Sequence, residues 1–439
     1  MPNDINQNHN SMQETKTKTQ ELIQLENKHG AHNYHPLPVV LSKGEGVYLW
    51  DVEGKQYYDF LSAYYAVNQG HCHPKIVGAL KDQADTLTLT SRAFHNDVLG
   101  PYEQFITEMF GFDKVLPMNS GAEAVETAMK LARKWAYEKK GIEQNKAKLI
   151  VCENNFHGRT TTIISFSNDP DAHENFGPYT PGFIRIPYND LDALREALEE
   201  DNIAGFMVEP IQGEAGVVTP DKGFIRKAQQ MCHDNNVLFI ADEVQTGIAR
   251  TGSLLAVCGN CTCENKCDQQ PETYTKPDIL LLGKALSGGA YPVSAVLADD
   301  EIMLVIKPGE HGSTFGGNPI AAKVAMAALE VVYDEKLIQN ARKLGEIFRN
   351  RMTQLAEKSE LVNKVRGRGL LNAVVINDTQ TSGTAWQICL KLRDNGLLAK
   401  PTHGNIIRFA PPLVMTEEQL NDCCSIIEKT ILEYEAENN

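Results

Sequence analysis

The sequence predicts an α/β fold with a large domain on a mostly parallel sheet and a smaller C-terminal α+β domain. From about residue 115 to 300, short apolar runs alternate with longer amphipathic runs. The short runs are apolar on both faces, which indicates strands covered by helices on both sides of a sheet. The chain has 439 residues and 42% hydrophobic content, enough for two domains.

The predicted elements follow from these runs in order. The strands are expected at 149–152, 205–208, 237–241, 279–282, 293–297 and 371–376, and the helices at 122–140, 191–199 and 223–235. After Asn318-Pro319, one long helical pattern continues to about Leu355. We divide the chain into a flexible arm (1–25), a segment that packs on both domains (26–75), a large domain (76–330) and a small C-terminal domain (331–439).

Charge and composition exclude several classes of partner. The net charge is −15, from 42 basic and 57 acidic residues, so nucleic acids and anionic membranes would be repelled. The apolar runs are far shorter than the roughly 20 residues that span a bilayer. The first residues contain Asp4 and Glu14 but no arginine, which fits neither a secretory signal nor a mitochondrial presequence. We therefore expect a soluble, cytoplasmic protein.

Two ionisable residues each follow a predicted strand. Asp242 comes directly after 237–241, and Lys284 is separated from 279–282 by one glycine. Alone, Asp242 would be typical of a helix cap and Lys284 of a solvated loop. The carboxyl ends of parallel strands, however, meet at the edge where open α/β folds bind ligands. The sequence therefore predicts an acid and an amine side by side in a site.

A third segment has the features of a phosphate site. Residues 120–124, Ser-Gly-Ala-Glu-Ala, lead into the long helix predicted to begin at Ala122. Small residues at a helix start leave backbone N–H groups accessible, and the helix dipole favours an anion there. By itself this signal is weak, because many helices begin with Ser-Gly.

Together these motifs resemble the class III (ornithine-type) aminotransferases of the fold-type-I pyridoxal-phosphate superfamily. The resemblance covers nearly all of the chain from Tyr34 to about Pro412. The matching motifs are Asn119-Ser-Gly-Ala-Glu-Ala124, Phe156-His-Gly-Arg-Thr160, Glu209-Pro-Ile-Gln-Gly-Glu214, Asp242-Glu-Val-Gln-Thr-Gly247, Gly283-Lys-Ala-Leu286 and Gly312-Ser-Thr-Phe-Gly-Gly-Asn-Pro319. The Asp242–Gly247 and Gly283–Leu286 pair is the most specific.

The resemblance implies a pyridoxal 5′-phosphate cofactor and a role for each matching residue. Lys284 would form a Schiff base with the cofactor aldehyde and then act as general acid and base. Asp242 would pair with the pyridine nitrogen and keep it protonated. The other expected cofactor contacts are Gln245 to the 3′-oxygen, Phe156 to the ring face, Gly121 and Ala122 to the phosphate, and Thr314 to the phosphate of a neighbouring subunit. This last contact implies a homodimer with shared active sites, and it leaves the question of a higher oligomer open.

The resemblance also implies ornithine as amino donor and 2-oxoglutarate as acceptor. Arg159, helped by Tyr34, would hold the carboxylate far from the reacting carbon. Glu214 would pair with Arg408 in the first half-reaction and release it in the second, so that Arg408 binds the oxo acid. Tyr64 matches a pocket tyrosine of the ornithine enzymes. For each tyrosine or glutamate, packing or an exposed charge is the alternative.

Other functions stay open at this point. His157 stands where a bulkier aromatic is usual, and the Phe-His-Gly-Arg-Thr form also occurs in acetylornithine aminotransferases. An acetylornithine or 4-aminobutyrate aminotransferase would use the same mechanism. An aminomutase, decarboxylase or epimerase on the same fold would not need Arg408 as a second carboxylate clamp. A non-catalytic binding protein conflicts with Lys284 and Asp242.

Four of the ten cysteines cluster between Asp242 and Lys284. They are Cys258, Cys261, Cys263 and Cys267. The Cys-x2-Cys spacing lets two thiolates reach one tetrahedral ion, which predicts a structural zinc site. The Cys-x-Cys step is unusual for such a site, so a redox pair or an inert surface insertion is the alternative. Nothing in the predicted transaminase chemistry requires this cluster.

Overall fold

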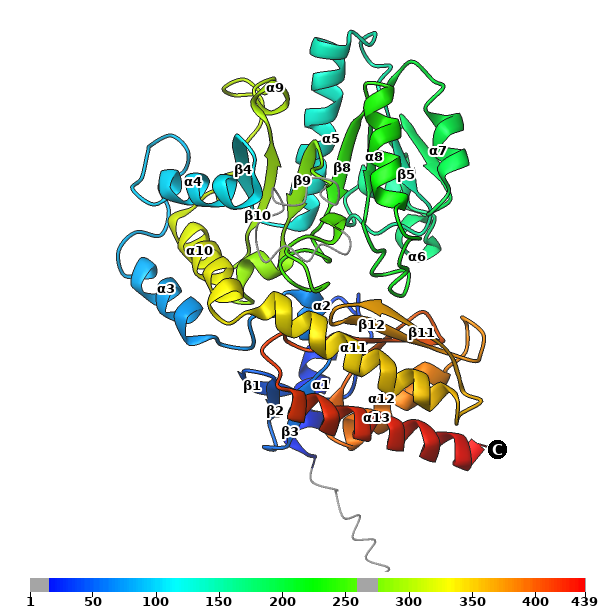
Figure 1. The fold of residues 1–439 in the computed structure, drawn as a ribbon. Coiled ribbons are helices and arrows are strands. Elements are labelled where there is room, and N and C mark those ends of the chain that lie inside the picture. Colours follow the sequence, from blue (N-terminus) through cyan, green and yellow to red (C-terminus); the bar gives the residue numbers. More distant parts are fainter. Residues whose placement is uncertain (1–15, 259–274, 439) are drawn as a thin grey trace, which may run out of the picture.

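The computed structural model describes residues 16–258 and 275–438 (Figure 1). A seven-stranded sheet has the order β4-β10-β9-β8-β7-β5-β6. Its strands are β4 (Lys114–Met118), β5 (Lys148–Cys152), β6 (Phe183–Ile186), β7 (Ile203–Val208), β8 (Leu238–Asp242), β9 (Ile279–Leu282) and β10 (Ser294–Ala298). Strand β10 runs antiparallel to both of its neighbours, and the remaining pairs are parallel. The mostly parallel sheet predicted from the sequence is confirmed.

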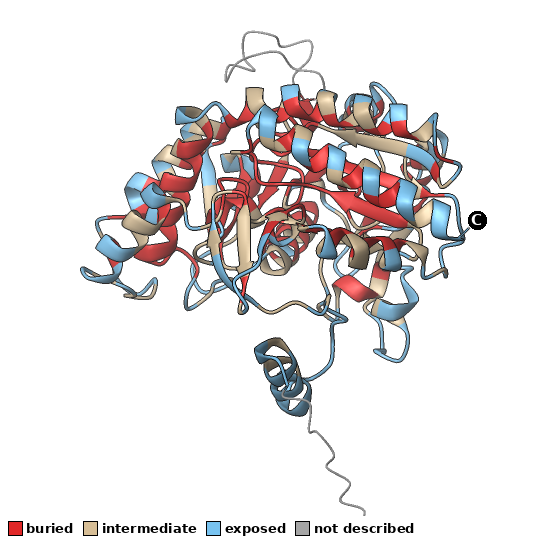
Figure 2. Cartoon of the chain, turned by 90° about the horizontal axis from the view of Figure 1, so that it is seen from below, coloured by how far each residue is buried: buried red, intermediate tan, exposed pale blue. Residues whose placement is uncertain are grey.

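The apolar runs form strands because both faces of this sheet are covered. Every residue of β7, β8, β9 and β10 is buried. In β9, Leu281 packs in the same apolar cluster as helix α5 (Gly121–Trp135), whereas Leu280 and Leu282 belong to the cluster on the opposite face, with helix α8 (Phe224–Asp234). Figure 2 shows the buried strands enclosed by helices that are exposed on their outer sides.

Two further sheets lie beside the large one. The first contains β1 (Leu41–Glu45), β2 (Tyr48–Asp51), β3 (Gln56–Asp59) and β13 (Leu397–Leu398), and the second contains β11 (Val362–Arg368), β12 (Leu371–Ile376), β15 (Ile406–Phe409) and β14 (Lys400–Thr402). Strand β3 pairs in parallel with β13, so the N-terminal segment packs with the C-terminal part of the chain. The proposed domain boundaries at 25, 75 and 330 stay a prediction.

The remaining helices connect and cover these sheets. They are α1 (Lys18–His29), α2 (Ser62–Tyr65), α3 (Pro74–Ala84), α4 (Leu99–Phe110), α6 (Pro170–His173), α7 (Leu191–Ala197), α9 (Asp300–Met303), α10 (Pro319–Asp334), α11 (Leu337–Ala356), α12 (Thr384–Asp394) and α13 (Glu417–Asn438). No helix in the described part of the chain is long and apolar enough to cross a membrane.

Three helices differ from the sequence prediction. The pattern after Asn318 forms two helices, α10 and α11, because Lys336 adopts a left-handed conformation with φ of 55° between them. The last turn of the predicted 122–140 helix, at Ala136–Lys140, is π-helical. The predicted flexible arm is helical from Lys18, where Thr17 begins α1 with a capping box.

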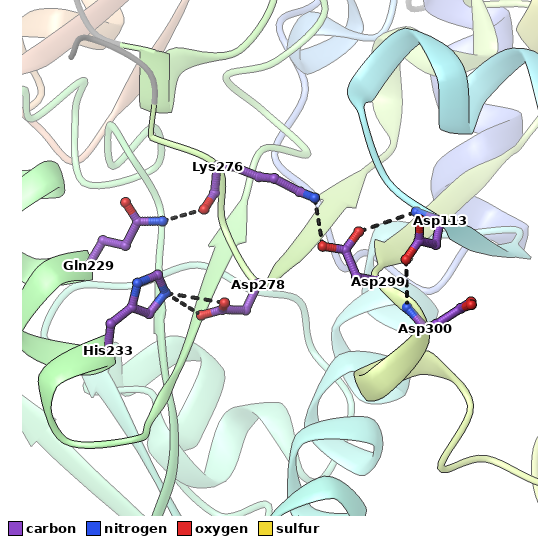
Figure 3. Close-up of polar contacts among 7 residues, drawn as sticks. All are labelled: Asp113, Gln229, His233, Lys276, Asp278, Asp299 and Asp300. Atoms are coloured by element: carbon purple, nitrogen blue, oxygen red, sulfur yellow. Dashed lines mark hydrogen bonds and ion pairs between the residues drawn. The ribbon is translucent and has the colours of Figure 1, made fainter. Parts of the chain in front are cut away.

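The amino edge of the large sheet carries a paired polar cluster (Figure 3). Lys276 Nζ lies 2.6 Å from Asp299 Oδ2, and His233 Nε2 lies 3.0 Å from Asp278 Oδ2. Asp278 also accepts a hydrogen bond of 2.7 Å from Phe239 N at the start of β8. These contacts tie α8 and the beginnings of β8 and β9 together at the edge opposite the predicted site.

Candidate active site

A cleft of about 170 Å³ opens at the carboxyl ends of β8 and β9. Its lining residues are Gly121, Ala122, Phe156, His157, Gly158, Glu209, Asp242, Val244, Gln245 and Lys284. Asp242 is the last residue of β8, and Lys284 follows β9, which pairs in parallel with β8. The structure therefore brings together the acid and the amine that the sequence placed at neighbouring strand ends.

Asp242 is buried and held on both carboxylate oxygens. Its Oδ2 lies 2.6 Å from His157 Nδ1, and its Oδ1 accepts a hydrogen bond of 3.1 Å from Val244 N. Burial acts to lower the pKa of His157, but the hydrogen bond and charge of Asp242 outweigh it and raise that pKa. The imidazole can therefore carry a proton beside Asp242 and fix the direction of the carboxylate.

Glu209 is a cleft residue that sequence reasoning did not single out. Its carboxylate accepts a hydrogen bond of 3.0 Å from Phe156 N. Burial raises the pKa of Glu209 to about 7, with His157 opposing and Asp242 adding to the rise. Its position in the Glu-Pro-Ile-Gln-Gly-Glu motif was the available signal, but a motif glutamate does not reveal its burial.

The Lys284 amine makes no hydrogen bond or ion pair with any residue in the described ranges. Burial lowers the pKa of its amine to about 8, with the charge of Arg408 in the same direction and that of Glu214 opposed. Its Nζ lies 5.9 Å and 5.6 Å from the ring centres of Tyr64 and Tyr65. An amine with this pKa exists in both protonation states near neutral pH, as acid–base chemistry requires.

The start of α5 leaves donors directed at the cleft. Ser120 is the N-cap and accepts from Glu123 N, while the Glu123 carboxylate accepts from the backbone N–H of Ser120. The N–H groups of Gly121 and Ala122 precede the first intrahelical bonds. A Cβ at Gly121 would lie 3.0 Å from Val244 Cγ1, so a side chain at this position would crowd Val244 and glycine fits best. The geometry can bind a phosphate.

The residues around the cleft fit pyridoxal phosphate. Gln245 Oε1 is buried and has no hydrogen-bond partner among the described residues, which suits a ligand that donates or bridges there. A Cβ at Gly213 would lie only 2.2 Å from that oxygen, so the backbone leaves room for the amide. With Asp242, Lys284 and the start of α5, these atoms offer partners for a ring nitrogen, an aldehyde and a phosphate.

A second group of residues lies on the substrate side of Lys284. Arg408 Nη1 on β15 lies 2.8 Å from Glu214 Oε1, and the Arg408 side chain is only 3% exposed. Burial acts to raise the pKa of Glu214, but Arg408 and then Lys284 outweigh it and lower that pKa. Thr402 Oγ1 donates to the backbone oxygen of Glu214 at 2.8 Å and holds its loop against β14.

The residues predicted to bind the distal carboxylate, Tyr34 and Arg159, are exposed. Burial raises the pKa of Tyr64, with smaller contributions from Arg408, Glu214, Tyr34 and Arg159. Arg159 lies 5.5 Å from the Phe156 ring centre and forms no ion pair within the described part of the chain. Its guanidinium is thus available for a carboxylate.

Two sequence predictions fall outside this cleft. Thr314 is exposed and is not one of the residues that line it, so its expected contact with a neighbouring subunit stays a prediction. Cys258 is buried, and Cys261, Cys263 and Cys267 lie outside the described residues. Among the residues at 16–258 and 275–438, no group of three or more metal-ligating side chains is assembled, so the predicted zinc site has no support from the structure.

The fold and the cleft are those of a fold-type-I pyridoxal-phosphate-dependent transaminase. The model of the class III aminotransferase family matches residues 29–431, and the chain belongs to this family. It is 62% identical over 407 residues to the mitochondrial ornithine aminotransferase of Drosophila ananassae, covering 93% of this chain and 90% of the relative. It is 58% identical over 413 residues to that of Rattus norvegicus, covering 94% and 90%.

Solved structures of similar proteins share this fold, and their names give two different substrates. The ornithine aminotransferase of Toxoplasma gondii ME49 is 48% identical, with a TM-score of 0.91 and 97% of each chain covered. The acetylornithine aminotransferase of Elizabethkingia anophelis is 64% identical, with a TM-score of 0.85, and the match covers 95% of this chain and 100% of that one. The matches establish the family, and the two solved structures differ in the amino donor that their names give.

Proposed function

We propose that the chain transfers the δ-amino group of L-ornithine to 2-oxoglutarate, forming glutamate 5-semialdehyde and L-glutamate. The observation that carries this proposal is the buried Glu214–Arg408 ion pair beside Lys284, with Arg159 uncommitted at the mouth. The ornithine aminotransferases among the relatives support the same donor.

The residues of the cleft have distinct tasks in this reaction. Pyridoxal phosphate, when bound, supplies an electron sink that stabilises negative charge at the reacting carbon. Asp242, oriented by His157, would keep the ring nitrogen protonated. Lys284 would hold the cofactor, and its Nζ would carry the proton. The start of α5 would bind the phosphate and Gln245 the ring oxygen.

The ion pair explains how one site accepts two dissimilar substrates. Ornithine reacts through its distal amine, where there is no carboxylate, so Arg408 must be neutralised, and Glu214 does this at 2.8 Å. The oxo acid brings a carboxylate next to its reacting carbon, and this carboxylate takes Arg408 when Glu214 withdraws. Bidentate arginine–carboxylate pairing makes such an exchange favourable.

The outer residues select the rest of the substrate. Arg159 and Tyr34 bind the carboxylate that is far from the reacting carbon in both half-reactions, and the Tyr64 ring centre lies 5.9 Å from Lys284 Nζ. Because Arg159 has no acidic partner in the described ranges, carboxylate binding there breaks no existing ion pair. This arrangement requires a substrate with a charged group at each end.

Acetylornithine is the second candidate donor, because the Elizabethkingia anophelis structure named for it is 64% identical. The two donors differ at the α-amine, which is charged in ornithine and acylated in acetylornithine. The test mixes purified holoenzyme with ornithine, N-acetylornithine or 4-aminobutyrate and follows the absorbance of the bound cofactor in single turnovers. Ornithine should react fastest. A faster reaction with N-acetylornithine would reverse the assignment.

We also propose a homodimer in the cytoplasm. Thr314 is exposed in a loop that Asn119 Nδ2 holds through Ser313 Oγ at 2.8 Å, next to the start of α5. This position supports a contact with the phosphate of a second subunit. Sedimentation of the holoenzyme should give twice the mass of one chain. Several relatives are named mitochondrial, and fractionation of the source cells tests the location.

A further inference from the structure

Residues Ser62 to Tyr65, labelled α2, form a left-handed turn at the edge of the active site. Their φ angles are 49°, 47°, 56° and 77°, and none of the four is a glycine. Each Cβ in this conformation crowds the following carbonyl oxygen, so left-handed residues normally occur singly. Consecutive left-handed residues next to a catalytic lysine point to a functional constraint.

Three hydrogen bonds hold the turn in this conformation. Asp59 Oδ1 accepts from Leu61 N at 2.8 Å and from Ser62 N at 2.9 Å. Ser62 Oγ donates to Ala410 O at 2.7 Å, two residues beyond Arg408. The turn is thus fastened to the chain that carries Arg408, and it presents Tyr64 and Tyr65 next to each other.

Tyr65 is completely buried among cationic side chains. Its ring centre lies 5.6 Å from Lys284 Nζ, 5.9 Å from Arg408 Cζ and 5.6 Å from Arg250 Cζ. Arg250 is already satisfied by Asn68 and two backbone oxygens, so it has no need of the phenol. Lys284 and Arg408 are therefore the nearby cations with which the Tyr65 hydroxyl can interact.

Two buried polar atoms in this group are unpaired. Neither the Tyr65 hydroxyl nor Arg408 Nε has a hydrogen-bond partner anywhere in the described part of the chain. Buried tyrosine hydroxyls and guanidinium N–H groups usually find partners, and an unpaired one opposes the conformation that contains it. Burial raises the pKa of Tyr65, and the charge of Arg408, whose Cζ lies 5.9 Å from the ring centre, opposes that rise.

We propose that Tyr65 is a positioning residue that holds Arg408 in its open state, by accepting a hydrogen bond from the guanidinium when Glu214 releases it. With Glu214 bound through Nη1, the guanidinium leaves both Nε and the phenol unpaired. Movement of Arg408 towards the oxo acid allows both atoms to pair. Tyr65 therefore favours binding of 2-oxoglutarate and has no part in the ornithine half-reaction.

This inference rests on the proposed function, and Tyr65→Phe tests it. The variant keeps the ring and removes only the hydroxyl. In single-turnover experiments on the pyridoxamine form, the apparent Kd for 2-oxoglutarate should rise about tenfold, the loss expected for one hydrogen bond to a charged group. The ornithine half-reaction on the pyridoxal form should change less than about twofold, because Arg408 is then paired with Glu214.

Tyr102→Phe is the matched control. Tyr102 on α4 is also fully buried with an unpaired hydroxyl, but it lies in the apolar core away from the cleft. Its replacement should leave both half-reactions unchanged. Equal losses in both half-reactions of Tyr65→Phe, or an unchanged Kd for 2-oxoglutarate, would overturn the proposal.

A double variant separates this proposal from the function on which it rests. In Glu214→Ala, Arg408 is open in both half-reactions, so adding Tyr65→Phe should weaken L-glutamate as a donor by a similar factor. If it does not, Tyr65 does not act through Arg408. A wild-type enzyme that fails to react with ornithine would instead contradict the proposed function, and the comparison of the two tyrosine variants with 2-oxoglutarate would still be valid.

Discussion

The two edges of the seven-stranded sheet carry the same kinds of side chain in opposite states. At the amino edge, His233 pairs with Asp278 at 3.0 Å with the imidazole 43% exposed, and Lys276 pairs with Asp299 at 2.6 Å (Figure 3). Each of these charges has a partner and contact with solvent. The cluster joins secondary-structure elements at the surface, where ion pairs contribute little to stability.

At the carboxyl edge, His157 pairs with Asp242 at 2.6 Å with the imidazole side chain 1% exposed. Lys284 has no ion-pair partner in the described ranges, and burial lowers its pKa to about 8. A His–Asp pair or a lysine at a strand end therefore does not define a site by itself. The carboxyl-edge groups differ because they are buried and because the Lys284 amine has no partner in the described ranges.

The largest difference between the two edges is expected when the lysine near either end of β9 is replaced. Lys284→Ala should reduce turnover by about four decades or more, because it removes both the cofactor attachment and the proton carrier. Lys276→Ala removes an ion pair with Asp299 and a contact with the Phe112 ring, both at the amino edge, and should leave turnover within about twofold. Borohydride reduction of the wild type and peptide mapping should find the cofactor on Lys284, and label on another lysine would exclude the assignment.

The aspartates allow the same comparison with a smaller effect. Asp242→Asn keeps the shape of the side chain but removes the negative charge that would keep the cofactor ring nitrogen protonated. Turnover should therefore fall by about two decades or more, roughly 3 kcal/mol in the barrier. Asp278→Asn retains a side-chain oxygen that can accept the hydrogen bond from Phe239 N, so this variant should have normal turnover. A near-normal rate for Asp242→Asn, measured at saturating cofactor, would remove Asp242 from the mechanism.

The third prediction concerns donor choice. In Glu214→Ala, Arg408 is unpaired in both half-reactions, so glutamate and other α-amino acids should become better donors by about tenfold. Ornithine should lose its preference for reaction at the distal amine. Glu428→Ala, which breaks the Arg351–Glu428 pair between α11 and α13, is the control. Half-reaction kinetics that show no faster reaction with glutamate would refute the exchange of partners by Arg408.

The smallest effect on turnover is expected from the four clustered cysteines, which lie between β8 and β9 in the sequence. Cys261→Ser with Cys263→Ser should leave turnover within about twofold, because any metal would stabilise this segment and not the chemistry. Elemental analysis of protein purified without a histidine tag or added metal tests zinc. Less than about a tenth of an equivalent, with titratable thiols, would exclude a site.

Much of the large sheet was predictable because burial on both faces leaves a continuous apolar signal. The predicted strands around Asp242 and Lys284 match β8 and β9, and the strand-end rule placed both residues at one edge. Strands β4 and β6 were not predicted. Pro117 interrupts the pattern of β4, and Arg185 that of β6 at the exposed edge of the sheet, so local sequence is a weak guide there.

The fold class and the family could be predicted from the sequence, because strand periodicity and short motifs encode them locally. Which groups are buried and unpaired depends on the packing of distant segments. His157 could bond Asp242 because β8 and the loop after β5 meet at the cleft. Tyr65 and Arg408 are 343 positions apart in the chain, and only the left-handed turn fastened to Ala410 brings them together. Burial and hydrogen-bond satisfaction are properties of the packed chain, so no local pattern can specify them.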